Sequence, residues 1–387
     1  MKFETIKEGI YWVGAIDWNV RNFHGYLTQR GTTYNAYLVI DEKITLIDTV
    51  KPGFEKEMFE RISKIIDPSK IDYIISNHVE MDHSGALPEV MKLAPNATIV
   101  TTKAGETGLK EHFGGENWNF KVVNTGDSVS LGKRSLAFVA TPMVHWPDNM
   151  VTYMPEEKIL FSNDAFGQHL ASSARFDDEY PLDIILFEAR KYYANIVLPY
   201  DKPVNKALGD ASNLDIQMIA PSHGLIWRKN LGEIISNYNR WAGNETIKKA
   251  VIVYDTMWGS TEKMAIAIQS AFEDKGYKCP LFSLQSNHIS DIITEILTAE
   301  YICVGSPTLN SNIMPSVAAF LTYLKGLAPK GRKAIAFGSY GWAAINVKQL
   351  EGYLIDSKFE IVDILKNKFV PTEDYLESIK SSLYEKI

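Results

Sequence analysis

The first 247 residues alternate between short apolar runs and polar connections, a pattern that predicts many strands and few helices. Apolar runs of strand length occupy residues 10–14, 34–40, 44–48, 71–76, 98–101, 135–140, 158–164 and 218–220. Apolar residues at helical spacing predict helices at residues 53–66, 88–93 and 182–194. Residues 18–33 are polar and aromatic without a clear period, so we expect a loop there.

From about residue 248 the pattern becomes regular. Strands are expected at residues 250–255, 277–284, 300–305, 333–338 and 359–363. Helical stretches alternate with them, at about residues 260–275, 289–298, 314–325, 344–356 and 372–385. Such alternation predicts a parallel sheet covered on both faces. Around residues 241–246 the periodic spacing of apolar residues is lost and charged residues become more frequent. We therefore expect a domain boundary there and two α/β domains, residues 1–247 and 248–387.

Composition narrows the class of protein. Apolar residues make up 45% of the chain and charged residues 22%, and the net charge is -7, which argues against disorder and against a basic surface for nucleic acid. No apolar run is long enough to cross a membrane, and the first residues lack the apolar core of a signal peptide, so we expect a cytoplasmic protein. The two cysteines, Cys279 and Cys303, allow neither a disulfide framework nor a Cys-x-x-Cys site. Any metal must be held by nitrogen and oxygen.

Four potential metal ligands lie within six residues: His78, Glu80, Asp82 and His83. They directly follow the apolar run at 71–76, so they should lie where a strand ends and a helix begins. Loops at the ends of parallel strands are where α/β folds bind ligands. The alternative is a polar loop with two surface histidines, because short motifs also occur by chance. The density of ligands favours a metal site.

Three further candidates each end an apolar run: His145, Asp164 and His223. An isolated histidine is more often structural than a ligand. Three such residues at strand ends are expected if their side chains converge on one rim of a sheet. The remaining histidines outside the irregular loop lack this context and receive no predicted role, namely His112, His169 and His288.

A second candidate site lies in the loop at 255–261, between the strand at 250–254 and the following helix. Backbone N–H groups and the hydroxyls of Thr256, Ser260 and Thr261 at a helix N-terminus favour a phosphate. The loop lacks the lysine of a nucleotide-binding P-loop and the glycine spacing of a dinucleotide site. The alternative is an ordinary helix cap.

Two other strand ends favour a flavin. In a sheet of order 2-1-3-4-5, the loops at 305–310 and 338–342 lie beside the phosphate loop. The small residues of these loops leave space for a flat ring, and Tyr340 and Trp342 offer aromatic surface to it. A cofactor with one phosphate and one ring system fits these loops, and FMN is such a cofactor. The expected FMN-binding residues are Thr256, Met257, Trp258, Gly259, Ser260, Thr261, Ser306, Pro307, Thr308, Leu309, Asn310, Ser339, Tyr340, Gly341 and Trp342.

The order of these residues resembles a known family. Asp48, His78-x-Glu80-x-Asp82-His83, His145, Asp164 and His223 follow one another as in the metallo-β-lactamase fold. The whole chain is similar to flavodiiron proteins, in particular at residues 31–38, 163–167, 221–224 and 254–258. The resemblance implies an αββα sandwich followed by a flavodoxin-like, doubly wound, five-stranded parallel sheet. The chain departs from relatives at Ala343 and Ala344, where glycine often follows the tryptophan.

By similarity, the histidines and carboxylates bind two iron ions. His78, Glu80 and His145 would bind one iron and Asp82, His83 and His223 the other, with Asp164 between them. Zinc hydrolases of this fold typically carry histidine where Glu80 stands. Three carboxylates beside four imidazoles suit iron or manganese better than zinc.

The resemblance also implies a reaction. Two ferrous ions and reduced FMN together hold the four electrons that convert O₂ to water, whereas reduction of two NO to N₂O needs two. His24 and Tyr193 match positions beside the metals and would donate protons or hydrogen bonds, although either could be structural. Further implications are a head-to-tail homodimer or a homotetramer, and an electron donor such as rubredoxin or reduced F420.

Two other functions remain open at this stage. One is a zinc hydrolase of the metallo-β-lactamase fold with an attached flavodoxin module, against which Glu80 argues. The other is a non-enzymatic flavin electron carrier whose first half is a scaffold. The sequence does not rank O₂ against NO, because relatives with either preference share these ligands.

Overall fold

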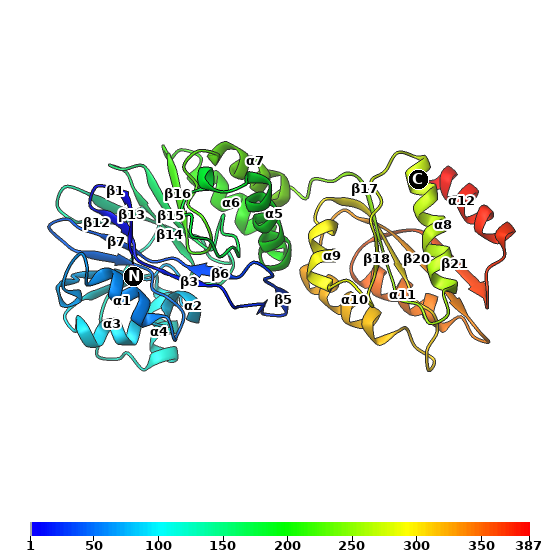
Figure 1. Cartoon of the computed structure of the whole chain (residues 1–387), viewed down its shortest axis with the longest axis horizontal. Coiled ribbons are helices and arrows are strands. Elements are labelled where there is room, and N and C mark those ends of the chain that lie inside the picture. Colours follow the sequence, from blue (N-terminus) through cyan, green and yellow to red (C-terminus); the bar gives the residue numbers. More distant parts are fainter. Residues whose placement is uncertain (1) are drawn as a thin grey trace. The chain divides into compact units, whose positions relative to one another are not determined.

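The computed structural model describes residues 2–387 and divides them into two compact units. The first unit comprises the chain up to His24, Thr28–Tyr192 and Lys202–Asn239. The second comprises Gly25–Leu27, Tyr193–Asp201 and Arg240–Ile387. Each unit has its own sheets and its own apolar core (Figure 1).

Two sheets form the first unit. The larger sheet has, in spatial order, β1 (Glu4–Lys7), β2 (Ile10–Trp12), β7 (Tyr37–Val39), β8 (Thr45–Ile47), β9 (Tyr73–Ile75), β10 (Thr98–Thr101) and β11 (Asn119–Val122). The smaller sheet has β12 (Ser128–Ser130), β13 (Ser135–Ala140), β14 (Met150–Met154), β15 (Ile159–Asn163) and β16 (Met218–Pro221). Two-stranded ribbons join β3 (Ala15–Asp17) to β6 (Thr32–Tyr34) and β4 (Asn22–Phe23) to β5 (Tyr26–Leu27).

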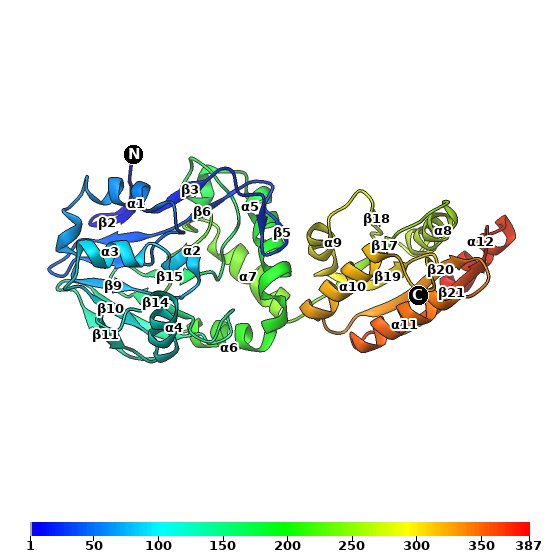
Figure 2. The same cartoon turned by 90° about the horizontal axis from the view of Figure 1, so that it is seen from below.

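The two sheets pack face to face through a shared apolar core. Trp12 and Tyr37 enter it from the larger sheet, and Phe138 and Phe161 enter it from the smaller sheet. In β13 buried and half-buried residues alternate, as expected for a strand with one face on the core. A second core lies between the larger sheet and the helices of its outer face, α1 (Glu55–Ile62), α3 (Leu87–Leu93) and α4 (Lys103–Phe113) (Figure 2).

Further helices lie beside the smaller sheet (Figure 1). Helices α5 (Leu182–Tyr192) and α6 (Asp201–Ala211) lie between β15 and β16 in the chain, and α7 (Leu231–Ala242) follows β16. The resulting sandwich of helices and two sheets confirms the predicted fold class. The first unit also contains the short helical segments α2 (Met81–Ser84), η1 (Pro68–Lys70) and η2 (Asp177–Glu179). The segments η3 (Tyr193–Val197) and η4 (Leu198–Tyr200) belong to the second unit.

The second unit contains the predicted parallel sheet. Its strands lie in the order β18 (Leu281–Ser283), β17 (Ile247–Tyr254), β19 (Ala299–Gly305), β20 (Lys333–Tyr340) and β21 (Glu360–Lys368), and every pair is parallel. This is the predicted order 2-1-3-4-5. The helices are α8 (Ser260–Asp274), α9 (Ile289–Ile296), α10 (Pro315–Leu327), α11 (Ile345–Asp356) and α12 (Glu373–Lys386). The carboxyl ends of β17, β19 and β20 therefore share one edge.

Some elements differ from the prediction. The run at 34–40 is divided between β6 and β7, because the backbone N–H of Asn35 donates to the carbonyl oxygen of Ser222 at 2.8 Å instead of to a neighbouring strand. Strand β14 was not predicted, because Thr152 interrupts the apolar run at its centre. No helix in the described part of the chain combines the length and apolar character that crossing a membrane requires.

Candidate metal centre and flavin pocket

The candidate metal ligands all lie at the ends of strands. Strand β9 ends at Ile75, and the chain then turns into the one-turn helix α2, which carries Asp82 and His83. His145 lies in the connection between β13 and β14. Asp164 directly follows β15, and His223 follows β16. These ends belong to both sheets of the sandwich, so the candidate site lies at one rim of the sandwich.

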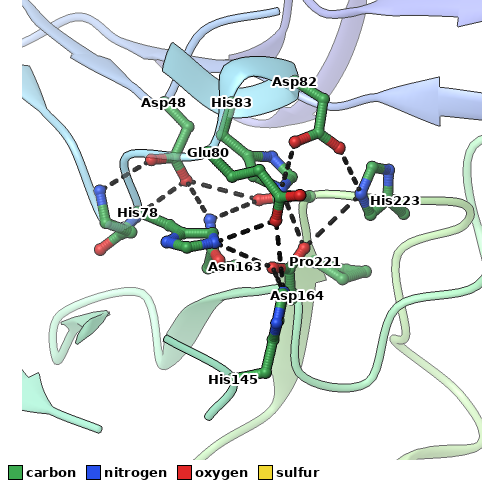
Figure 3. Close-up of polar contacts among 12 residues, drawn as sticks. Asp48, His78, Glu80, Asp82, His83, His145, Asn163, Asp164, Pro221 and His223 are labelled. Carbon is green, nitrogen blue, oxygen red and sulfur yellow. Dashed lines mark hydrogen bonds and ion pairs between the residues drawn. The ribbon is translucent and has the colours of Figure 1, made fainter. Parts of the chain in front are cut away.

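The structure brings seven predicted residues together in what we call the ligand cluster (Figure 3). Its first group is His78, Glu80, His145 and Asp164, and its second group is Asp82, His83 and His223; within each group the potential ligand atoms lie within 4.8 Å of one another. In the first group, Oε2 of Glu80 is 3.2 Å from Nε2 of His78 and 3.4 Å from Nε2 of His145. In the second, Oδ2 of Asp82 is 3.1 Å from Nε2 of His223.

Asp164 lies between the two groups. Its Oδ2 is 3.2 Å from Nε2 of His145 and 3.7 Å from Nε2 of His78. Its Oδ1 is 2.9 Å from Nε2 of His83 and 3.5 Å from Nε2 of His223. One oxygen of this carboxylate faces each group, which is the orientation that a carboxylate needs to bridge two metal ions.

The chemistry of the cluster fits metal ions. Both carboxylate oxygens of Asp82, both of Asp164 and both ring nitrogens of His83 are buried and have no hydrogen-bond partner. The 2.9 Å approach of His83 to Asp164 therefore lacks the alignment of a hydrogen bond. Buried polar atoms without partners are costly, and cations at this position would satisfy them. An all-nitrogen and oxygen donor set with several carboxylates suits iron.

The charges of the cluster support the same reading. Burial lowers the pKa of His78 and of His145, but the facing carboxylates outweigh burial and raise both pKa values to about 10. Burial raises the carboxyl pKa of Glu80 and of Asp164, but the facing imidazoles outweigh it and hold both pKa values well below their usual range. The carboxylates therefore stay ionised and stabilise positive charge, which metal ions would supply in place of imidazole protons.

Asp48 holds the backbone from which three ligands project. Its Oδ1 accepts a hydrogen bond from the backbone N–H of Asn77 at 2.8 Å, and its Oδ2 accepts one from Nδ2 of Asn77 at 3.0 Å. Oδ2 also accepts longer hydrogen bonds, both 3.4 Å, from Nδ2 of Asn163 and Oγ of Ser222 (Figure 3). These three residues directly precede members of the cluster, namely His78, Asp164 and His223.

His24, predicted to act beside the metals, contacts the ligand cluster. Its Nε2 lies 2.7 Å from Oε1 of Glu80, and its side chain is 64% exposed. The hydrogen bond to Glu80 raises the pKa of His24 more than partial burial lowers it. His24 therefore connects a ligand of the first group with solvent.

The structure places Tyr193 differently from its neighbour Tyr192. The ring of Tyr193 packs 5.3 Å from that of Trp241, in the segment that belongs to the second unit. The ring of Tyr192 instead lies 6.0 Å from His223 and 5.1 Å from His169. Burial, and then the negative charges of Asp164 and other cluster carboxylates, raise the pKa of Tyr192 well above its usual value. Tyr192 thus lies beside the ligand cluster, as does Tyr34, whose ring is 6.1 Å from that of His223.

The three histidines without a predicted role occupy different positions. His169 is buried beside His223, with ring centroids 4.7 Å apart, and its Nδ1 lies 2.8 Å from Oγ1 of Thr32. His288 caps α9 by accepting a hydrogen bond from the N–H of Ser290. His112 is exposed on α4. Only His169 contacts a residue of the ligand cluster among these three, and no strand end marked it in the sequence.

The second unit contains a cavity of about 430 Å³ at the carboxyl ends of β17 and β20. Ten residues predicted to bind FMN line it, namely Thr256, Met257, Trp258, Ser260, Pro307, Thr308, Ser339, Tyr340, Gly341 and Trp342. The N-terminus of α8 lies at the cavity, where Ser260 lines it, so the helix dipole favours a phosphate there. The volume is in the range of cofactor sites. Trp258 and Trp342 are 93% and 92% exposed, as aromatic rings available to a planar ligand would be.

Five predicted FMN-binding residues do not line the cavity, namely Gly259, Thr261, Ser306, Leu309 and Asn310. Thr261 and Ser306 are fully buried and support the loops from behind. The prediction missed three lining residues, Ala343, Phe369 and Val370. Phe369 and Val370 directly follow β21, so the rule that ligands lie at strand ends could have found them.

The two alanines that replace glycine near Trp342 are accommodated without strain. Ala344 has φ -83°, which any residue adopts, and Ala343 is not among the residues with positive φ. The carbonyl oxygen of Ala343 accepts a hydrogen bond from Oγ1 of Thr308 at 3.2 Å. Glycine is therefore not required at either position.

Comparisons with known proteins assign both units. Residues 32–224 match the family described as ODP family beta lactamase, and residues 252–381 match the family described as Flavodoxin. A nitric oxide reductase of Moorella thermoacetica is 50% identical over 362 residues, which cover 92% of this chain and 91% of that protein. The rubredoxin-oxygen oxidoreductase of Megalodesulfovibrio gigas is 42% identical over 387 residues, covering 98% and 96%.

Solved structures agree along the whole chain. The structure of rubredoxin oxygen:oxidoreductase from Desulfovibrio gigas matches with a TM-score of 0.97 and 42% identity, covering 100% of this chain and 97% of the other. The crystal structure of the flavodiiron protein from Giardia intestinalis matches with a TM-score of 0.97 and 38% identity, covering 100% and 96%. Identity of this order over nearly the full length of these proteins shows that the chain belongs to the flavodiiron protein family.

Proposed function

We propose that this flavodiiron protein reduces O₂ to water and NO to N₂O at a pair of iron ions, with electrons that arrive through FMN. The observation that carries the proposal is the Asp164 carboxylate, which turns one oxygen to each group of the ligand cluster. A site for one metal ion does not need such a carboxylate between two complete ligand groups, and Glu80 argues against zinc in a two-metal site. The names of the relatives, nitric oxide reductase and rubredoxin-oxygen oxidoreductase, support both gases.

The proposed metal ligands divide by group. His78, Glu80 and His145 would hold one iron, Asp82, His83 and His223 the other, and Asp164 would contact both. When bound, the iron pair and FMN supply the electrons of the reduction. Because six of the seven residues are buried, they hold the reacting centre away from bulk water, and only His145 is partly exposed.

His24 is proposed to deliver protons. Reduction of O₂ to water consumes protons, and a donor must reach the centre from solvent. His24 is exposed on one side and lies 2.7 Å from Glu80 on the other, so it can take a proton from water and hold it beside the ligand cluster. The carbonyl oxygen of Thr33, which lies 2.7 Å from Nδ1 of His223, has the position to orient that ring.

FMN is the proposed flavin, in the cavity bounded by the loops after β17, β19 and β20. Thr256 and Ser260 would face the phosphate at the start of α8, and Trp258 and Trp342 would flank the ring system. We place the boundary between the metal domain and the flavin domain near residue 247. The gap between the two matched families, 32–224 and 252–381, supports this position.

We further propose a head-to-tail homodimer, itself able to pair into a homotetramer, and rubredoxin as the electron donor, with reduced F420 as the alternative. Exposed apolar side chains around the flavin cavity support a surface that another protein covers, namely Met257, Trp258, Trp342, Phe369 and Val370. The names rubredoxin-oxygen oxidoreductase and flavorubredoxin among the relatives support the donor.

The test is to purify the protein, measure its metals and flavin, reduce it without air and add O₂ and NO in separate pulses. We expect yellow flavin absorbance, iron rather than zinc, and rapid consumption of at least one gas with reoxidation of the flavin. Protein that contains zinc without iron, or that consumes neither gas when fully loaded, would contradict the proposal.

A further inference from the structure

Asn346 lies directly behind the flavin cavity without lining it. It belongs to the first turn of α11, which begins after the loop that carries Trp342, and it is fully buried. Residues that line a cavity contact its ligand directly, whereas a buried residue behind the lining acts by holding the lining in place.

The side-chain amide of Asn346 joins two neighbouring strand ends. Its Nδ2 donates hydrogen bonds to the carbonyl oxygen of Ser306 at 2.6 Å and to that of Ser339 at 3.0 Å. Ser306 follows β19, and Ser339 lies near the end of β20. Because both partners are carbonyl oxygens, which only accept, the atom between them must be the amide NH₂ group. One side chain therefore fixes the separation of two loops that bound the cavity.

The surroundings of the Asn346 amide leave no room for a water molecule in its place. A Cβ atom added at Gly338 would lie 2.0 Å from the carbonyl oxygen of Ser306 and 2.6 Å from Nδ2 of Asn346. The two strands and the amide are thus in close contact, without space for a water molecule between them. If the amide were removed, the buried carbonyl of Ser306 would lose this donor, whereas that of Ser339 would keep only the hydrogen bond from the backbone N–H of Thr308. The loop after β19 would then have to move for the carbonyl of Ser306 to reach another donor.

Thr308 extends the same connection to the lining of the cavity. Its backbone N–H donates to the carbonyl oxygen of Ser339 at 3.2 Å, and its Oγ1 donates to that of Ala343 at 3.2 Å. Thr308, Ser339 and Ala343 all line the cavity. A change in the separation that Asn346 sets would therefore change the width of the space into which a flat ring enters.

We propose that Asn346 is a positioning residue for the flavin, which fixes the spacing of the loops after β19 and β20 and thereby sets the affinity for FMN and the reduction potentials of the bound flavin. The inference rests on the proposed FMN site. It goes beyond that site, because Asn346 does not line the cavity and yet controls how the ligand is held.

The test compares Asn346→Leu with Gln349→Leu in the full-length protein. Leucine has the same number and branching of side-chain heavy atoms as asparagine and has no donor. Gln349 lies one turn further along α11 and bonds Ile313 and Asn312 at the far end of the loop after β19, where neither residue lines the cavity. It is therefore a matched control for the loss of a hydrogen bond from α11 to that loop, without loss of the link between the two strand ends. FMN affinity is measured by titration of flavin-free protein, and both flavin potentials by anaerobic spectroelectrochemistry. We expect FMN to bind about tenfold more weakly to Asn346→Leu, with shifted potentials, and Gln349→Leu to resemble wild type.

A second variant keeps the test decisive if Asn346→Leu does not fold. Serine in Asn346→Ser can donate to only one of the two carbonyls, so an intermediate loss of affinity is expected. Wild-type affinity and potentials in either folded variant would overturn the inference, as would an equal loss in Gln349→Leu. Failure of the wild-type protein itself to bind FMN would instead contradict the proposed flavin site.

Discussion

Nδ1 of His78 donates a hydrogen bond to Oδ2 of Asp148 across 2.9 Å. The same oxygen accepts a hydrogen bond from the backbone N–H of Val79 at 2.8 Å, and the backbone carbonyl of Asp148 accepts one from Oγ1 of Thr102 at 2.9 Å. The carboxylate is therefore fixed in place and holds the proton of the ring on Nδ1. With a metal bound, Nε2 of His78 then presents its lone pair to the metal.

Replacement of Asp148 by alanine is expected to weaken iron binding about 10- to 100-fold, because His78 loses the partner that fixes its orientation and tautomer. The measurement is competition for iron with a chelator under anaerobic conditions. Asp67→Asn is a suitable control, since Asp67 is an exposed cap of a short helix and asparagine caps equally well. Equal iron affinity in Asp148→Ala and wild type would show that the hydrogen bond has no role in metal binding.

The candidate ligands could be predicted from the sequence because four of them follow one apolar run as a dense motif and the other three each end a separate run. Strand ends of parallel or mixed sheets meet at a common edge, so His145, Asp164 and His223 converge although far apart in the chain. Asp148 lies inside an irregular connection, where no period gives its orientation. Its role follows only from the contact with His78.

The surroundings of Tyr193 could not be predicted from the sequence, for a different physical reason. A helix over 182–194 was expected, but the α-helix ends at Tyr192 and a π-helix occupies Tyr193–Val197. A π-helix has more residues per turn, so side chains after its start no longer follow the α-helical spacing. The direction of Tyr193 relative to Tyr192 therefore depends on packing that the apolar pattern does not contain.

The metal preference is predicted to depend on Glu80. The Glu80→His variant would convert the first group into three imidazoles with Asp164, a donor set that suits zinc. We expect a higher zinc content, less iron and loss of gas reduction. Metal analysis of protein purified from medium with equal iron and zinc measures the change. Glu89→His on the surface of α3 controls for an added histidine. An unchanged iron-to-zinc ratio would contradict the role of Glu80.

Asp48 is predicted to stabilise the first unit and to order the ligand cluster. It has φ +54°, a left-handed conformation that asparagine tolerates better than alanine. Asp48→Ala adds strain and removes the acceptor of the Asn77 hydrogen bonds, so we expect the free energy of unfolding to fall by about 3 kcal/mol. Asp48→Asn keeps the backbone but loses one acceptor oxygen, so a smaller loss of stability with reduced iron content is expected.

Urea denaturation of the metal-free variants measures the stability difference, and iron analysis measures the effect on the cluster. The two variants separate two effects. Backbone strain, which only Asp48→Ala adds, lowers stability alone. The loss of an acceptor oxygen, which both variants share, also affects the loops that carry the ligands. Full iron content in Asp48→Asn would show that the carboxylate does not order those loops.

Proton delivery is predicted to depend on His24. The His24→Ala variant removes the group that bonds Oε1 of Glu80 but leaves the seven residues of the ligand cluster in place, so iron content should stay near that of wild type. Gas reduction should slow by about 100-fold, the usual effect of losing a proton donor. Turnover is measured with the flavin already reduced, so that electron supply does not limit the rate.

The control for His24 is the pH dependence of the two proteins. A proton donor lost from the protein is replaced by water, so the rate of His24→Ala should rise more steeply with acidity than that of wild type. If His24 instead only positions Glu80, the variant should lose iron, and the shape of its pH profile should match wild type. A solvent isotope effect that increases in His24→Ala would further support proton transfer as the slow step, because the reaction would then wait for water to supply each proton.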